Sequence, residues 1–106
     1  MIFRGTTPTI TLNITNADDI DFANITNPRI TILNDSGRNK KTFIDCSIDT
    51  VKKTISTKLS YDDTMSFEVG YLLVQLAADI TVEENVVDKY RSPVLRMQIG
   101  EDYEDK

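Results

Sequence analysis

Short stretches in which apolar and polar residues alternate recur, with turn signals between them, along this chain of 106 residues. Alternation with period two places apolar side chains on one face of a strand, and the first such stretch, Thr9–Ile14, puts Ile10, Leu12 and Ile14 on one side. No long segment keeps a helical period. The pattern therefore predicts an all-β fold, an antiparallel β-sandwich of about seven strands.

The remaining strands are expected over Arg29–Leu33, Thr42–Ile48, Val51–Leu59, Tyr71–Val82 and a final strand over Val86–Ile99 that is interrupted at Ser92 and Pro93. Asn34–Gly37 is a strong turn signal, so residues 29–48 are predicted to form a β-hairpin. Tyr71–Ala77 is apolar on both faces, which is typical of a central strand. Pro93 lacks a backbone donor, so the last strand should lie at a sheet edge or carry a bulge there.

One short helical turn is predicted over residues 60–67, bridging the two sheets. Ser60 is followed three residues later by Asp63, which is a loose capping-box pattern. Tyr71 is expected to pack near this corner. Residues 1–100 are expected to form a single domain, and residues 101–106 an acidic tail that frays.

The chain contains no histidine and a single cysteine, Cys46. Nucleophile pairs that need histidine, histidine-ligated zinc sites and thiolate metal clusters are therefore excluded. Cys46 lies in an alternating stretch without a basic neighbour, and we interpret it as a small buried hydrophobic residue. The sequence predicts a protein that is not an enzyme.

The net charge of −5 disfavours direct nucleic-acid binding, which needs clustered cations against phosphates. The concentrated basic run, Arg38–Lys41, is interpreted as a solvated hairpin tip. No apolar run approaches the roughly 20 residues needed to span a bilayer, so we expect no membrane helix. No basic stretch leads into an apolar run at Met1, so we also expect no cleaved leader and a domain made in the cytoplasm.

Carboxylates occur in three groups, at residues 18–21, at residues 62–63 and in the tail. A glycosidase needs two acids across a sugar-sized cleft, and the sequence predicts neither a cleft nor aromatic platforms. The first group has the ligand type for calcium but lacks the spacing and glycine of an EF-hand loop. We therefore predict no catalytic, cofactor or metal site.

Three segments together carry a resemblance to a known family. Arg4–Thr9 leads directly into the first strand, Leu59–Phe67 follows later, and Gly70–Leu76 comes after it. In this order they resemble small proteins encoded in the tail and baseplate regions of Firmicutes phages and prophages. They resemble more distantly the immunoglobulin-like N-terminal domain of upper baseplate proteins. The resemblance covers residues 4–99 and implies an immunoglobulin-like sandwich without catalytic residues.

The resemblance implies a structural or assembly role through protein–protein contacts, in the host cytoplasm during assembly or in the virion. The partners would be other phage structural proteins or further copies in a homo-oligomer, without nucleic acid or membrane. An edge strand offers unpaired backbone groups, and the edge is expected at Thr9–Ile14 or within Val86–Ile99. The candidate interaction residues are Thr9, Thr11, Asn13, Asp88, Tyr90, Arg96 and Gln98.

An alternative from a different class is a module that binds carbohydrate or a host surface. It would use loop tips at Asp18–Ile25, Arg38–Lys41 and Glu83–Asn85.

Overall fold

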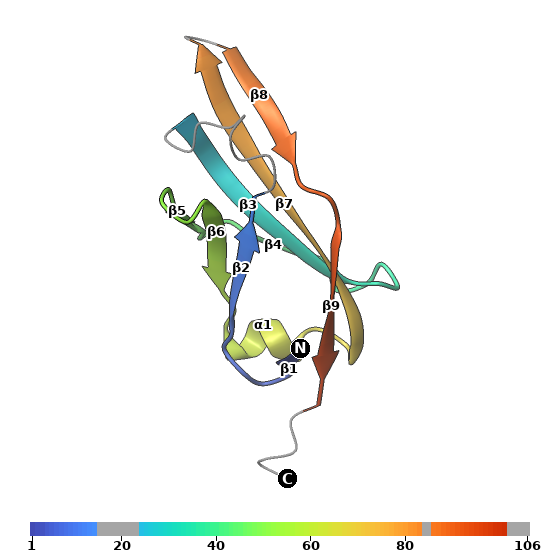
Figure 1. Cartoon of the computed structure of the whole chain (residues 1–106). Coiled ribbons are helices and arrows are strands. Elements are labelled where there is room, and N and C mark those ends of the chain that lie inside the picture. The colour runs from blue at the N-terminus through green and yellow to red at the C-terminus, as the bar shows by residue number, and fades with distance from the viewer. Residues whose placement is uncertain (15–23, 84–85, 102–106) are drawn as a thin grey trace.

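The computed structural model describes residues 1–14, 24–83 and 86–101, which form two β-sheets and one short helix (Figure 1). The larger sheet has six strands in the order β1-β9-β7-β3-β4, with β8 also paired to β7. The smaller sheet has three strands in the order β2-β6-β5. The expected all-β sandwich with one helical turn is confirmed.

The strands of the larger sheet are β1 (Ile2–Phe3), β3 (Ile25–Asn34), β4 (Lys41–Phe43), β7 (Gly70–Glu83), β8 (Val86–Arg91) and β9 (Leu95–Gly100). Those of the smaller sheet are β2 (Thr9–Asn13), β5 (Ser47–Asp49) and β6 (Thr54–Lys58), and α1 covers Tyr61–Met65. In the described part of the chain, all strand pairs are antiparallel except β1 with β9. The described residues hold nine strands because β1 is added and because the expected strand Thr42–Ile48 and the expected final strand Val86–Ile99 are each divided into two.

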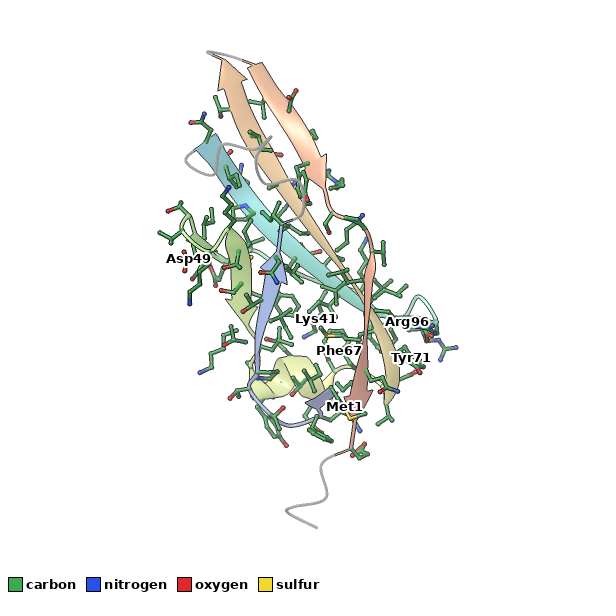
Figure 2. All side chains as sticks on the ribbon, viewed as in Figure 1. Met1, Lys41, Asp49, Phe67, Tyr71 and Arg96 are labelled. Atoms are coloured by element: carbon green, nitrogen blue, oxygen red, sulfur yellow. The ribbon has the colours of Figure 1, made fainter. Side chains whose placement is uncertain are left out.

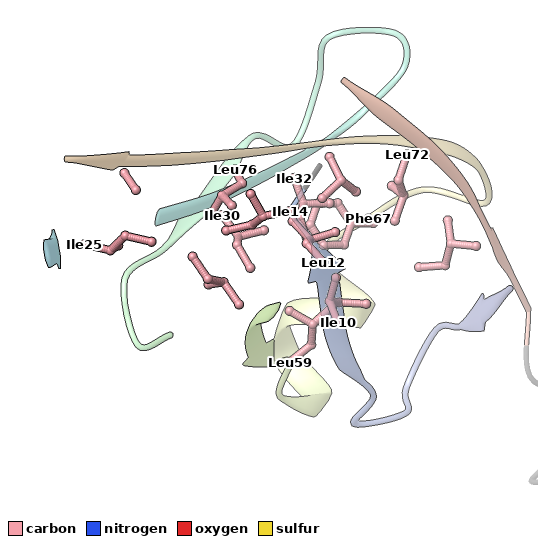
Figure 3. Close-up of a cluster of buried hydrophobic side chains, with 14 residues drawn as sticks. Ile10, Leu12, Ile14, Ile25, Ile30, Ile32, Leu59, Phe67, Leu72 and Leu76 are labelled. Carbon is pink, nitrogen blue, oxygen red and sulfur yellow. The ribbon is translucent and has the colours of Figure 1, made fainter. Parts of the chain in front are cut away.

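Strand β7 is the central strand, as predicted, because it pairs with β3 on one side and with both β8 and β9 on the other. Its inward residues Leu72, Val74 and Leu76 are at most 1% exposed. They belong to one apolar cluster that also takes side chains from the smaller sheet (Figure 3). The core therefore lies between the two sheets. The side chains that form it are Ile10, Leu12, Ile14, Ile25, Ile30, Ile32, Ile55, Leu59, Phe67, Leu72, Val74, Leu76, Ala78 and Ile99.

The break predicted at Pro93 separates β8 from β9, which pair with successive parts of the same side of β7. Ser92 bridges the break. Its backbone N–H donates to the Leu76 carbonyl, and its hydroxyl accepts from the Leu76 N–H, both at 2.9 Å. The serine side chain therefore replaces a ladder acceptor where the proline interrupts the strand.

The predicted hairpin over residues 29–48 is correct as far as Phe43, which pairs with Ile30. It is wrong beyond that point, because residues 44–46 leave the larger sheet and Ser47–Asp49 pairs with β6 in the smaller one. Ile44, Cys46 and Ile48 alternate with polar residues, but Phe43 lies out of phase with them, and Ile44 is 72% exposed. The alternation of residues 44–48 does not show which sheet they join.

The expected strand Val51–Leu59 begins later than predicted, at Thr54. Val51 is 89% exposed and lies in a turn, where the Asp49 carboxylate accepts the backbone N–H groups of Val51 and Lys52. Within β6, Ile55 and Thr57 face inward and are buried.

Helix α1 is capped as predicted. The Ser60 hydroxyl accepts from the Asp63 N–H, and the Asp63 carboxylate accepts from the Ser60 N–H. Burial would raise the pKa of Asp63, but the Ser60 hydrogen bonds and the nearby Lys41 ammonium outweigh it and lower that pKa. The cap therefore fixes where the chain leaves β6.

Thr64 joins the two connections that cross between the sheets at this end of the molecule. The N-terminal segment crosses from β1 to β2, and α1 crosses from β6 to β7. The fully buried Thr64 hydroxyl donates to the Thr6 carbonyl at 2.8 Å and accepts the Gly5 N–H at 3.0 Å. One side chain thus holds the N-terminal segment against α1.

Asn34 fastens the end of β3 to the segment that enters β7. Its amide donates to the Glu68 carbonyl at 2.8 Å, and its side-chain oxygen accepts the Glu68 N–H at 3.0 Å. The side chain is 4% exposed, and the same oxygen also accepts from Asn39. Asn34 therefore satisfies a backbone segment that no strand pairs.

We predict that Thr64→Val destabilises the domain by about 1–3 kcal/mol, because it leaves two backbone groups without partners. Thr64→Ser keeps the hydroxyl and loses one methyl group, so it should cost less, about 1 kcal/mol. Urea unfolding measures both free energies. Equal losses for the two variants would contradict the role given to the hydroxyl.

Candidate interaction surfaces

Exposed apolar side chains gather at the end of the molecule that carries α1 and the N-terminus. Met1 is 72% exposed, Phe3 43%, Tyr61 57% and Met65 39%. Figure 1 places β1 beside α1 at this end, and Figure 2 shows Met1 there. We call Met1, Phe3, Tyr61 and Met65 the apolar end.

Two close approaches and one arginine position these side chains. Gly5 has φ +79°, and a Cβ there would lie 3.4 Å from the Tyr61 ring and 3.6 Å from the Met65 sulfur. A Cβ on Gly100 would lie 3.5 Å from both the Met1 sulfur and the Phe3 ring. The backbone at Gly5 and Gly100 therefore lies next to the four apolar side chains, and it is the positive φ of Gly5 that favours glycine there.

Arg4 lies between the two halves of the apolar end. Its guanidinium forms an ion pair with Glu101 at 2.5 Å and donates to the Met65 carbonyl at 3.1 Å. Its backbone N–H donates to the Gly100 carbonyl at 2.9 Å. The surface thus combines tyrosine, phenylalanine, methionine and arginine, which are the residue types enriched in protein–protein interfaces.

Strand β2 forms a second candidate surface, because it is an edge of the smaller sheet. The Ile14 N–H donates to the Lys53 carbonyl, and the Leu59 N–H donates to the Pro8 carbonyl. With the register of β2 and β6, this places the backbone groups of Ile10, Leu12 and Ile14 toward β6. The backbone groups of Thr9, Thr11 and Asn13 therefore point to the free edge.

The structure places the seven candidate interaction residues on different surfaces and does not bring them together. Thr9, Thr11 and Asn13 are exposed on the outer face of the smaller sheet. Arg96 and Gln98 are exposed on β9, and Tyr90 packs against the core from β8. Asp88 is exposed two positions before Tyr90. The β9 edge is free only in part, since β1 pairs with its last two residues.

Tyr71 lies beside Arg96 rather than in the α1 corner, which corrects the expectation for it. The Arg96 guanidinium lies 4.0 Å from the centre of the Tyr71 ring, and Figure 2 shows the two together. Arg96 also pairs with Asp35 at 3.4 Å. Tyr71 follows the alternation of β7, which turns its side chain away from the buried Leu72.

The outer face of the larger sheet carries a shallow hollow of about 280 Å³. Its lining mixes apolar groups with hydroxyl, amide and amine groups, from Thr31, Leu33, Lys40, Thr42, Leu73, Val74, Gln75 and Val94. Thr31 and Thr42 lie 3.1 Å apart through their hydroxyl oxygens. Such a lining can contact a polar ligand, but no aromatic ring stands in it.

A charged cluster surrounds Asp79 where β3, β7 and β8 meet. Its carboxylate accepts from Lys89 at 3.0 Å and from the Asn27 amide at 3.4 Å, and Arg29 lies 3.6 Å away. The Lys89 and Asn27 hydrogen bonds lower the pKa of Asp79, against an opposing effect of burial, and the two cations add to the lowering. The cluster holds the β3 bulge at Asn27, whose φ is +51°.

Cys46 is half-buried and packs against the core, and its thiol donates to the Phe43 carbonyl. Burial raises the pKa of this thiol, which disfavours the reactive thiolate. The basic run Arg38–Lys41 follows the turn after β3, and Lys41 pairs with Asp63 at 3.5 Å.

Several expectations lie outside the described residues. These are the carboxylates at 18–21, residues 84–85 of the loop tip Glu83–Asn85 and the tail beyond Glu101. Among residues 1–14, 24–83 and 86–101, no three potential metal ligands gather. No helix in this part of the chain is long and apolar enough to cross a membrane.

The chain matches no protein-family model and no curated protein. The resemblance to phage tail and baseplate proteins therefore depends on the residues that carry it.

The sequence pattern did not single out the apolar end. Met1 and Phe3 belong to a strand of two residues, which is too short to show alternation. Tyr61 and Met65 lie on a helix of five residues, also too short for a periodic face. The available signal was the presence of Tyr, Met, Phe and Arg, residue types common in interfaces, in the two segments that cross between the sheets.

The lowered pKa of Asp79 predicts an acid-dependent loss of stability. Its contribution is complete above the unfolded value of about 3.9 and is lost as the pH falls through the lower folded value. Urea unfolding between neutral pH and the acid range should show a smaller loss for Asp79→Asn than for the parent. Asp88→Asn, a carboxylate in the same strand pair, is the control and should keep the parental loss. If Asp79→Asn lost as much unfolding free energy as the parent between neutral and acid pH, the prediction would be refuted.

Proposed function

We propose that this protein is a non-enzymatic structural or assembly protein of a phage or prophage, from the tail or baseplate region. It acts through protein–protein contacts with other phage structural proteins or with further copies of itself. The observation that carries the proposal is the apolar end, which leaves Met1, Phe3, Tyr61 and Met65 between 39% and 72% exposed. The phage assignment itself comes from the resemblance.

The free energy of contact favours covering this surface. Full burial of one large apolar side chain contributes roughly 1.5–3 kcal/mol, so several together can support a specific complex. Monomeric soluble proteins rarely leave such side chains grouped, and grouping of this kind is typical of interaction sites. The net charge of −5 keeps separate copies apart in solution until a complementary partner is present.

In this proposal the protein meets its partner in the host cytoplasm during assembly and either stays in the virion or leaves before completion. Mass spectrometry of purified particles and of assembly intermediates distinguishes the two locations.

We predict that a double variant, Tyr61→Lys with Met65→Lys, reduces association with particles or intermediates by at least about tenfold, because two charges would be desolvated at the contact. The variant is introduced into the strain that encodes the chain, phage production is induced, and the protein is quantified in the fractions. Both side chains are substantially exposed, so the fold should persist.

Val51→Lys is the matched control, because Val51 is 89% exposed in the turn between β5 and β6. This variant should associate as the parent does. A parental protein that is missing from particles and from every assembly intermediate would refute the phage role.

A second candidate function is glycan binding, and the hollow with Thr31, Thr42, Gln75 and Lys40 in its lining favours it. Hydroxyl, amide and amine groups are suited to hydrogen bonds with sugar hydroxyls. A glycan array should then give signals that fall with Gln75→Ala and persist with Val51→Lys. No signal above background on the array would remove this candidate.

A further inference from the structure

The larger sheet is five strands across and the smaller one three, so among the described residues no strand of the smaller sheet lies opposite β9 or β1, and the empty position beside β2 is the one opposite β9. Residues 44–46 connect β4 to β5, so these two strands mark the same side of the sandwich. Counting from that side, β3 lies over β6 and β7 lies over β2. Strand β9 comes next in the larger sheet, and the smaller sheet ends at β2, as Figure 1 shows.

A narrow apolar recess of about 60 Å³ lies at this empty position. It is lined by Leu12, Asn13, Leu76, Tyr90, Ser92, Pro93 and Leu95. Leu95 and Ile99 alternate onto the same side of β9, yet Leu95 is 45% exposed and Ile99 is 1% exposed. The inner side of β9 is therefore covered near Ile99 and uncovered near Leu95.

The free edge of β2 borders this recess. The register with β6 turns the backbone groups of Thr9, Thr11 and Asn13 to this edge, where no described strand pairs with them. The strand contains no charge and no proline, which are the usual devices that block pairing at an edge.

A second copy cannot fill the position by pairing its own β2 with this one. With both larger sheets on the same side, the second copy's β7 would fall where β9 already lies, because neighbouring strands are about 4.8 Å apart. With the larger sheets on opposite sides, the second copy would turn its polar Thr9, Thr11 and Asn13 toward the apolar recess. The position therefore accepts a single strand that does not carry a second sheet packed against it.

We propose that the free edge of β2 and the recess beside it bind a single extended segment of a partner protein by β-strand addition. The inference rests on the proposed function, since it specifies one of the protein–protein contacts. The segment pairs its backbone with Thr9, Thr11 and Asn13. It carries apolar side chains at alternate positions, which face Leu12 and Leu95, and polar ones between them.

The experiment uses the whole chain and two synthetic peptides of about nine residues, the length of an ordinary strand. The first has Val and Ile at alternate positions, Thr between them and Lys at both ends. The second has the same composition with its apolar residues grouped together. Calorimetric titration should show saturable binding of the first and at least about tenfold weaker binding of the second, since only alternation presents one apolar face.

Four variants test the geometry. Thr11→Pro removes an N–H from the free edge without touching the β6 ladder, and it should weaken binding at least about tenfold. Thr11→Ser keeps a small uncharged side chain and the backbone donor, so binding should persist. Leu95→Lys should weaken binding by a similar factor. Its neighbour Val94→Lys, with Val94 in the lining of the outer hollow, should bind as the parent does.

Unfolding transitions establish that each variant is folded, and Leu95→Lys still tests the recess if Thr11→Pro does not fold. Amide hydrogen exchange adds a direct readout, because the peptide should slow exchange at Thr9, Thr11 and Asn13. Equal binding of the two peptides, or full binding by folded Thr11→Pro, would overturn the inference.

The outcome separates this inference from the proposed function. If no peptide binds while the apolar-end variant loses particle association, the phage role stands and strand addition at β2 is refuted. If the alternating peptide binds while the protein is missing from all particle fractions, the edge site stands and the phage role is refuted.

Discussion

The hydrogen bonds of one buried hydroxyl position both the apolar end and the free edge of β2. Thr64 lies on α1, and its side chain satisfies two consecutive backbone positions, Gly5 and Thr6. The N-terminal segment reaches β1 in the larger sheet on one side of this point and β2 in the smaller sheet on the other. The apolar end and the start of the free edge therefore share one anchor, and a change there would move both.

Unequal sheet width is the second constraint. Leu59, Phe67 and Ile99 are all buried at the end that α1 and the N-terminal crossing occupy. Neither element extends toward Pro93, and Leu95 remains 45% exposed there. The same two crossings thus close one end of the sandwich and leave its side open further along. The open side is a consequence of where the connections fall rather than of a weak core.

Much of this arrangement could be predicted from sequence, and the limits have physical causes. The capping box at Ser60, the central role of Tyr71–Ala77 and the interruption at Pro93 depend on local chemistry, and each is confirmed. The change of sheet after Phe43 depends on long-range strand pairing, and period-two alternation does not show which strands pair. The predicted edge at Thr9–Ile14 was correct as an edge, whereas the other candidates of that set scatter over separate faces.

The chemistry of the free edge follows from its place in the chain. Strand β2 lies directly after a crossing, so its first residues are fixed by Pro8, whose carbonyl accepts the Leu59 N–H. Its inward residues are already buried, at 4% for Ile10 and 5% for Leu12. An added strand would therefore gain little from β2 side chains and most from backbone pairing and from the uncovered Leu95. The backbone hydrogen bonds of such a contact are the same for every sequence, and the recess contacts only one face of the added strand. The contact therefore favours an extended segment in which apolar and polar side chains alternate.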